Sequence, residues 1–386
     1  MQHAPLPPSG SPIWVECNGA PRMWEGLPNL ETDDTREGEA VHWLCESALT
    51  TGPFSLLDAA GVVAPNGVVI TDEMIDAAVM YVQEVSQGSG DLHVEERVEM
   101  PEIHIHCWGT PDAWRFNPST QHLTIYDFKY GHRSVDPYEN WQLICYALGI
   151  LRILTNNNPL SDMFTITVEF VIVQPRCYYD HRGPVKTWTI RNWELRAYVN
   201  KLHMAAEQAY TNNPSLKCGE YCRDCNAASK CPALMQAGAE LADYAGRAYH
   251  HHGTPEGIEY EYRTLKRAGE LLKARLEAIE QEAMTRIQSG NFIPGLTVEH
   301  PMSRNKWLQP DTQVISMCQL LGVDVSKTTA ITPTQAVAKF KKEGLDPAII
   351  EGTYGRTQTS AKLVMDDNSR AKQIFSQEKI YDTASN

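Results

Sequence analysis

The stretch from Gly109 to Gly149 constrains the fold of this chain more than any other. It reads GTPDAW, a short polar turn, LTIYDFKYG and then NWQLICYALG. The segment LTIYDFK is rich in β-branched and aromatic residues, which predicts a strand. Because side chains alternate between the two faces of a strand, we expect Asp127 and Lys129 on one face and Phe128 on the other.

A second carboxylate precedes this strand. Asp112 follows a Gly-Thr-Pro corner, where the chain leaves the apolar run IHIHCW. Two carboxylates and an ammonium group suit metal-assisted cleavage of a phosphodiester, because the carboxylates hold a divalent cation that polarises the phosphate and activates a water. The lysine then orients that water or neutralises developing charge. The alternative is that Asp127 and Lys129 form a solvated ion pair of little energetic consequence.

The order of the motifs favours the catalytic alternative. Gly-x-Pro-Asp, a hairpin-length gap and Asp-x-Lys are followed by a predicted helix, on which Gln142 and Tyr146 share a face. This ordered set resembles the PD-(D/E)XK nuclease superfamily, and within it the RecB-like nucleases. The resemblance implies the following roles: catalysis by Asp112, Asp127 and Lys129, metal binding by Asp112, Asp127 and the backbone carbonyl of Phe128, and a DNA-facing helix with Gln142 and Tyr146.

An earlier helix extends the resemblance. The segment REGEAVHWLCESAL has apolar residues at helical spacing. RecB-like nucleases carry a Gly-x-x-x-His helix before the catalytic strands, and Gly38 and His42 fit this pattern. The resemblance therefore implies that His42 joins the Mg²⁺ or Mn²⁺ site, although a single histidine on a helix is more often structural.

Cysteines cluster in one segment, KCGEYCRDCNAASKCPAL, which holds four of the ten in the chain. By themselves, Cys218, Cys222, Cys225 and Cys231 could form one zinc or iron–sulfur site, because the short loops allow the thiolates to converge. The remaining cysteines, apart from Cys17, lie singly in apolar runs and are expected to be small buried side chains.

The RecB-like resemblance implies a different grouping of cysteines. Iron–sulfur members of that family use one leading cysteine and a trailing Cys-x-x-Cys-x5-Cys, which Cys222, Cys225 and Cys231 reproduce. Cys17 is then the leading ligand of a [4Fe–4S] cluster that ties the N-terminal segment to the end of the domain, and Cys218 is spare. Ligation by Cys218 instead of Cys17 stays open, as does zinc instead of iron.

The predicted elements give an α-β-β-β-α-β order. The strands are expected at LHVEERVEM, IHIHCW, LTIYDFK and FTITVEFVIVQP, with helices over residues 138–154 and 192–210. This order predicts an α/β fold, a mixed sheet flanked by helices, as in the restriction-endonuclease-like PD-(D/E)XK core. Three glutamates, Glu95, Glu96 and Glu99, precede the active-site motifs, and a solvated strand face is the favoured interpretation for them.

We expect three regions: a flexible leader over residues 1–12, a nuclease domain with the cysteine segment over 13–235, and a mostly helical accessory region over 236–386. The last resembles the C-terminal part of phage-encoded RecB-like proteins, through SRNKW and ITPTQAVAKF. It includes a long helix that begins at Thr254-Pro255-Glu256 and runs towards Gln288. The triplet His250–His252 is expected to be an exposed polar turn.

Composition limits the cellular setting. No apolar run approaches the ~18 residues of a membrane helix, and no signal peptide is evident. We therefore expect a cytoplasmic protein, in the host cytoplasm if the chain is phage-encoded. The net charge of −14 disfavours nonspecific coating of nucleic acid but is compatible with a local basic groove.

The sequence thus predicts a metal-dependent DNA nuclease, most plausibly a phage exonuclease that processes DNA ends so that a single-strand annealing protein can load. Self-association of the chain is a further expectation. A Walker-type phosphate loop is absent from the sequence, so the chain lacks a recognisable helicase motor. The alternatives are a catalytically idle DNA-binding or assembly module and a zinc-stapled structural protein.

Overall fold

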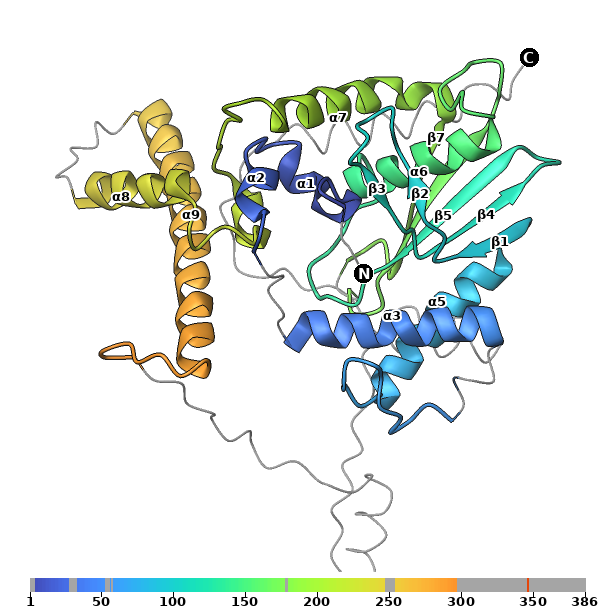
Figure 1. Ribbon diagram of the computed structural model, residues 1–386, viewed down its shortest axis with the longest axis horizontal. Coiled ribbons are helices and arrows are strands. Elements are labelled where there is room, and N and C mark those ends of the chain that lie inside the picture. Colours follow the sequence, from blue (N-terminus) through green and yellow to red (C-terminus); the bar gives the residue numbers. More distant parts are fainter. Residues whose placement is uncertain are drawn as a thin grey trace, which may run out of the picture. The chain divides into compact units, whose positions relative to one another are not determined.

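The computed structural model describes residues 4–27, 33–52, 56, 58–177, 180–246, 254–296 and 346 (Figure 1). The chain divides into two compact units, Met1–Met302 and Ser303–Asn386, and almost all described residues belong to the first. Several features singled out in the sequence lie outside the described residues: Cys318, the histidine triplet at 250–252, SRNKW and ITPTQAVAKF.

A mixed five-stranded sheet forms the centre of the first unit. Its strands lie in the order β1-β4-β5-β6-β7, with β5 and β6 parallel and the other neighbours antiparallel. The strands are β1 (Asp91–Val94), β4 (Ala113–Asn117), β5 (His122–Phe128), β6 (Thr167–Val173) and β7 (Val185–Arg191). A separate two-stranded sheet pairs β2 (Val98–Glu99) with β3 (Trp108–Gly109). The predicted α/β class, with a mixed sheet flanked by helices, is confirmed.

Helices cover both faces of this sheet (Figure 1). On one side lie α3 (Asp33–Thr51) and α5 (Asp72–Gln87), and on the other α6 (Trp141–Leu154) and α7 (Arg196–Ala209, after the short η2, Asn192–Leu195). Alternation along β5 supplies both cores, since Ile125 packs with the α6 side and Phe128 with the α3 side. The Asp-x-Lys motif therefore lies at the end of a strand that is buried on both faces.

Short helices surround the cysteine segment. They are η1 (Pro8–Gly10), α1 (Ser11–Trp14) and α2 (Ala20–Trp24) near the N-terminus, and η3 (Glu220–Asp224) and α8 (Pro232–Gly246) later in the chain. The long helix α9 (Pro255–Gln288) follows, and Thr254 caps it by accepting a hydrogen bond from Gly257 N, as the sequence predicted.

Two predicted strands differ from the structure. IHIHCW forms turns, and only its last residue lies in β3. In a strand Ile103 and Ile105 would share one face, but Ile103 is fully buried whereas Ile105 is 77% exposed. Pro101 also precedes this segment and cannot donate to a strand ladder. The strand predicted at LHVEERVEM breaks into β1 and β2 at Glu95, whose φ of 50° interrupts the extended backbone.

Other elements were missed or begin elsewhere. The polar turn expected after GTPDAW starts later, because AWRFN itself forms β4. The helix α5 and the strand β7 were not predicted. Helix α6 begins at Trp141, three residues beyond the expected start, because Asn140 caps it by accepting from Leu143 N.

The segment expected as a flexible leader contains packed residues. Leu6 is fully buried, its N–H donates to the carbonyl oxygen of His106, and it belongs to the core on the α6 side of the sheet.

The cysteines expected to be small buried side chains, Cys45, Cys107, Cys145 and Cys177, are at most 2% exposed, which confirms that part of the interpretation. Among the helices in the described ranges, none is both long and apolar enough to cross a bilayer.

Candidate metal-dependent active site

Three carboxylates line up across neighbouring strands. In β4 and β5, Ala113 pairs with Tyr126, so the register places Asp112 beside Asp127 at the same end of the hairpin. In β1 and β4, Val94 pairs with Ala113, and Glu95 N donates to the carbonyl oxygen of Asp112 one step further on. The pairing of the strands therefore places the three acids at one edge of the sheet.

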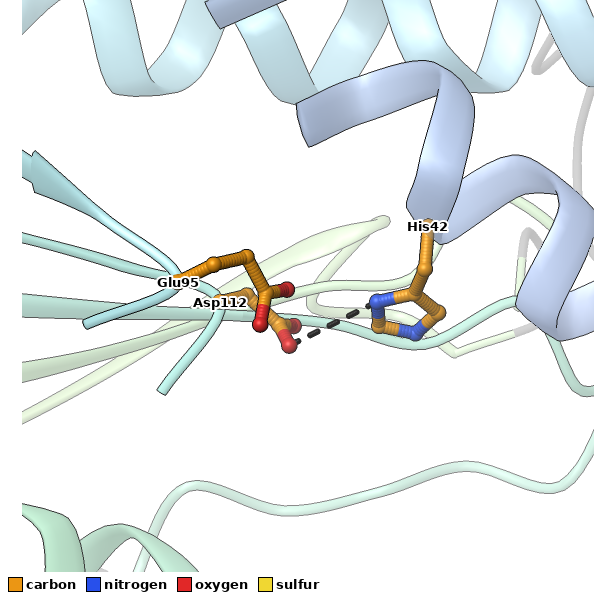
Figure 2. A group of neighbouring side chains, drawn as sticks. All are labelled: His42, Glu95 and Asp112. Atoms are coloured by element: carbon orange, nitrogen blue, oxygen red, sulfur yellow. Dashed lines mark ion pairs between the residues drawn. The ribbon is translucent and has the colours of Figure 1, made fainter. Parts of the chain in front are cut away.

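Helix α3 adds a histidine to this edge. The Nδ1 atom of His42 lies 3.4 Å from Oδ1 of Asp112, and the ring packs edge-on against Phe128. One ligand atom from each of His42, Glu95 and Asp112 can be chosen so that all three lie within 4.8 Å of one another, and Figure 2 shows the three side chains converging. This group could hold a metal ion.

Lys129 continues the site beyond the end of β5. Its Nζ lies 3.0 Å from Oδ2 of Asp127 and donates to Oδ1 at 3.2 Å and to Oε1 of Gln142 at 3.1 Å. Gln142 in turn donates to the hydroxyl of Tyr146 at 3.4 Å. The face of α6 that carries Gln142 and Tyr146 thus contacts Lys129, which the sequence predicts to be catalytic. We call His42, Glu95, Asp112, Asp127 and Lys129 the carboxylate site.

Asp112 is the best-stabilised anion of the carboxylate site. Burial alone would raise the pKa of its carboxyl, but the charges of His42 and Lys129 outweigh burial and lower it. The backbone N–H of Phe128 also donates to its Oδ2 at 2.7 Å. For His42 and Lys129, burial lowers the pKa but the neighbouring carboxylates outweigh it and raise it, so both groups favour their protonated forms when no metal is bound.

The other two carboxyls lack enough positive charge nearby. Burial, reinforced by Asp112, raises the pKa of Glu95 to about 8. Burial also raises the pKa of Asp127, against the opposing charge of Lys129, whose Nζ forms an ion pair with the buried Oδ2 of Asp127. Hard oxygen ligands with an imidazole fit a divalent cation such as Mg²⁺ or Mn²⁺.

The structure brings all the predicted residues of this site to one place. His42, Asp112, Asp127, Lys129 and Gln142 contact one another in a chain, and Phe128 supplies a backbone donor to Asp112. Glu95 joins them, whereas sequence reasoning favoured a solvated strand face for it. No local pattern predicts the position of the Glu95 side chain, because the strand breaks at Glu95 itself and the break turns the side chain towards the site. The metal-binding role of the Phe128 carbonyl stays a prediction.

The four cysteines predicted from the trailing motif and the N-terminus line one hollow. We call it the cysteine hollow. Its lining is otherwise mostly apolar and consists of Ile13, Cys17, Ala20, Met23, Leu216, Lys217, Tyr221, Cys222, Cys225, Ala227, Ala228, Cys231 and Leu234. Cys17 comes from the turn after α1, about two hundred residues before the other three, so the fold brings distant parts of the chain together.

Three of these four sulfurs accept hydrogen bonds from N–H groups. The Nε1 of Trp24 donates to Sγ of Cys225 at 3.3 Å, Lys217 N to Sγ of Cys17 at 3.4 Å and Gly219 N to Sγ of Cys222 at 3.4 Å. Such donors stabilise thiolates in metal centres. Cys218 is half-buried beside the hollow rather than in its lining, and burial with the nearby Cys222 raises the pKa of its thiol to about 12.

Comparison with protein families gives one match that covers most of the chain. The sequence model described as "Protein of unknown function (DUF2800)" matches residues 3–371. The chain therefore belongs to the DUF2800 family, and the match includes both the carboxylate site and the cysteine hollow.

Proposed function

We propose that this member of the DUF2800 family is a Mg²⁺- or Mn²⁺-dependent DNA nuclease of the RecB-like PD-(D/E)XK type. One observation carries the proposal: Asp112, Asp127, Lys129 and Gln142 meet at the end of a buried strand, where His42 and Glu95 also lie close to Asp112. Carboxylates clustered beside an imidazole repel one another unless a cation lies among them. A divalent cation would supply that positive charge.

The cation would be held by His42, Glu95, Asp112 and Asp127. Held there, such a cation would supply polarisation of the scissile phosphate and a lower pKa for a water. Asp112 is held in place for this role, because Phe128 N donates to one of its oxygens and leaves the other towards His42. Glu95 is fixed by its own N–H, which donates to the Asp112 carbonyl oxygen.

Lys129 would orient the attacking water or stabilise the charge that develops on the phosphate. Its ammonium is held between Asp127 and Gln142, so it cannot swing freely into solvent. Gln142 is then a positioning residue for the lysine, and Tyr146 supports Gln142 in turn. The DNA-facing role of this helix remains part of the proposal.

The cysteine hollow would hold a [4Fe–4S] cluster, with Cys17, Cys222, Cys225 and Cys231 as ligands. The support is the joint lining by these four residues, the apolar surroundings and the N–H donors to the sulfurs. Hydrogen bonds to sulfur and exclusion of solvent are the means by which proteins tune such clusters. A tetrahedral zinc site is the competing occupant.

We further propose that the enzyme is an exonuclease, of phage or prophage origin and active in the host cytoplasm, which prepares DNA ends for a single-strand annealing protein. The test compares linear with covalently closed duplex DNA in the presence of Mg²⁺, Mn²⁺ or a chelator. An exonuclease degrades only the linear DNA and stops when the metal is removed. Cleavage of closed DNA would replace the exonuclease by an endonuclease, and cleavage of neither, with metal present, would contradict the nuclease proposal.

A further inference from the structure

Helix α9 carries two apolar stripes, and among the residues that the structure describes only one of them packs against other elements. Ala268, Leu271 and Ala274 are at most 6% exposed and belong to the side that contacts the cysteine segment and α8. Arg275 strengthens this contact, since its Nη1 donates to the carbonyl oxygens of Ala228 and Ser229. This first stripe explains how the helix is attached to the rest of the unit.

The second stripe faces solvent. Its large apolar side chains are between 38% and 57% exposed and comprise Ile258, Leu265, Leu272, Leu276 and Ile279. Ile258, Leu265, Leu272 and Ile279 recur at every seventh residue. With Tyr262, Gly269, Leu276 and Ala283 between them, the positions alternate at spacings of four and three, which is the a/d pattern of a coiled coil. We call these eight residues the α9 seam.

We propose that the α9 seam pairs with the same seam of a second copy of this chain, as a parallel, in-register two-stranded coiled coil. Leu265 and Leu272 would occupy the two central d positions, where leucine suits a parallel dimer. The seam from Ile258 to Ala283 extends over about 38 Å at the rise of an α-helix, or somewhat under four heptads. This inference concerns assembly and holds whether or not the carboxylate site is a nuclease.

Charges that flank the seam select the parallel orientation. In a parallel coiled coil, a g residue faces the e residue five positions further along the partner. Glu261 would then face Lys266 of the second copy. This pair is of opposite charge and occurs twice in a symmetric dimer.

An antiparallel pairing with full overlap of the seam would bring like charges together. In that arrangement e faces e and g faces g, which gives Lys266 opposite Lys273, Glu259 opposite Glu280, and Glu261 opposite Glu282. Like charges at these positions destabilise the pairing and disfavour the wrong orientation. The charge pattern therefore complements a second copy in one orientation only.

Gly269 is the weak point of the seam. A Cβ atom added there would meet nothing within 4 Å, so the position has room for a larger side chain. Glycine also lowers helix stability by about 1 kcal/mol relative to alanine. Leucine at this position should both stabilise α9 and fill the interface, so Gly269→Leu is expected to tighten the dimer by about tenfold or more.

The first test measures the mass of the full-length protein by sedimentation equilibrium over a wide range of concentration. We expect a monomer–dimer equilibrium that Leu272→Lys weakens by about 100-fold or more, because each dimer loses two buried leucines. Tyr260→Lys is the matched control, since Tyr260 is 62% exposed on the same helix but lies off the seam. A wild-type protein that stays monomeric, for instance because another segment of the chain covers the seam, would overturn the proposal. So would a dimer that Leu272→Lys leaves unchanged.

The second test determines orientation from the sign of a charge effect. Lys266→Glu should weaken a parallel dimer by about tenfold, because it places two glutamates opposite each other twice. The double variant Glu261→Lys/Lys266→Glu should restore the affinity. In an antiparallel dimer, Lys266→Glu would instead relieve the repulsion with Lys273 and tighten the dimer, and that outcome would contradict the parallel arrangement.

Discussion

The carboxylate site and the cysteine hollow are built in opposite ways. The carboxylate site follows from strand register: Glu95, Asp112 and Asp127 occupy successive positions across β1, β4 and β5. The cysteine hollow follows from tertiary folding, since Cys17 lies far in sequence from the other three cysteines that line it. The first needs the sheet to form, whereas the second needs the segment around Cys17 to meet the segment from Cys222 to Cys231.

The two sites also differ in what holds them together without a metal. In the carboxylate site, protein groups already pair with the charged atoms, through Phe128 N, Lys129 and His42. In the cysteine hollow, thiols lie among apolar side chains, and the ordinary hydrogen bonds and ion pair that join the two chain segments, such as Gly19 N to the Ser215 carbonyl oxygen and Lys217 to Glu16, do not involve the sulfurs. We therefore expect the divalent cation to matter for activity and the cluster to matter for stability.

The largest expected effect is on catalysis. Asp127→Ala or Lys129→Ala should reduce cleavage of linear DNA by about 100-fold or more, because a metal ligand or a charge-stabilising ammonium is lost. Circular dichroism and melting temperature should remain close to wild type. Asp91→Ala, at an exposed position of β1, is the matched control and should retain full activity. Undiminished cleavage by either active-site variant would remove the carboxylate site from the reaction.

The next largest effect is on stability. Anaerobically purified protein should be brown, and serine at Cys17, Cys222, Cys225 or Cys231 should each remove the colour and lower the melting temperature, since the cluster closes a loop of about two hundred residues. Cys218→Ser is the matched control and should keep both the colour and the stability. Iron and zinc analysis checks the metal. One zinc without iron, or colour that depends on Cys218 but not on Cys17, would reverse the assignment.

A smaller effect is expected at Glu95, which only the structure places in the carboxylate site. Glu95→Gln keeps the size of the side chain but removes its charge, so Mn²⁺ should bind about 10–100-fold more weakly and excess Mn²⁺ should restore part of the activity. Electron paramagnetic resonance of free Mn²⁺ measures the affinity. Glu96→Gln is the control, because Glu96 is exposed and pairs with His93. Equal affinity for Mn²⁺ in both variants would contradict a metal-binding role for Glu95.

The smallest effect concerns the tuning of the cluster. Trp24→Phe removes the indole N–H that donates to Cys225 Sγ while keeping an aromatic ring in place. Loss of a hydrogen bond to a cluster sulfur lowers the reduction potential, so redox titration should show a modest negative shift with the colour preserved. Trp193→Phe, in η2, should leave the potential unchanged. An unchanged potential in Trp24→Phe would place the cluster away from Cys225.

Sequence patterns predicted which residues meet in the carboxylate site better than they predicted where the strands begin and end. The Asp-x-Lys strand and the helix with Gln142 were correctly predicted, because a buried strand and a strongly apolar helix have clear local signals. Strand β4 was missed because its Trp114 and Phe116 follow directly on the Asp112 corner, which masks the start of a new element. Tertiary packing, not local pattern, determines such starts.

Glu95 shows why part of the site could not be predicted. Its role depends on a left-handed backbone conformation and on the pairing of β1 with β4, and neither has a local sequence signature. The α9 seam shows the reverse case, since its heptad spacing is plain in the sequence but its exposure appears only in the structure. A pattern becomes informative once the structure shows which of two apolar stripes is already packed.

Anomalous diffraction from crystals of anaerobic protein soaked in Mn²⁺ tests the account most directly, because it locates both metals in one experiment. We predict a manganese signal among His42, Glu95, Asp112 and Asp127, and a separate iron signal among the cysteines of the hollow. A manganese signal elsewhere, or none, would contradict a metal-dependent carboxylate site. Zinc in the cysteine hollow would contradict the iron–sulfur assignment and leave the carboxylate site to be judged on its own.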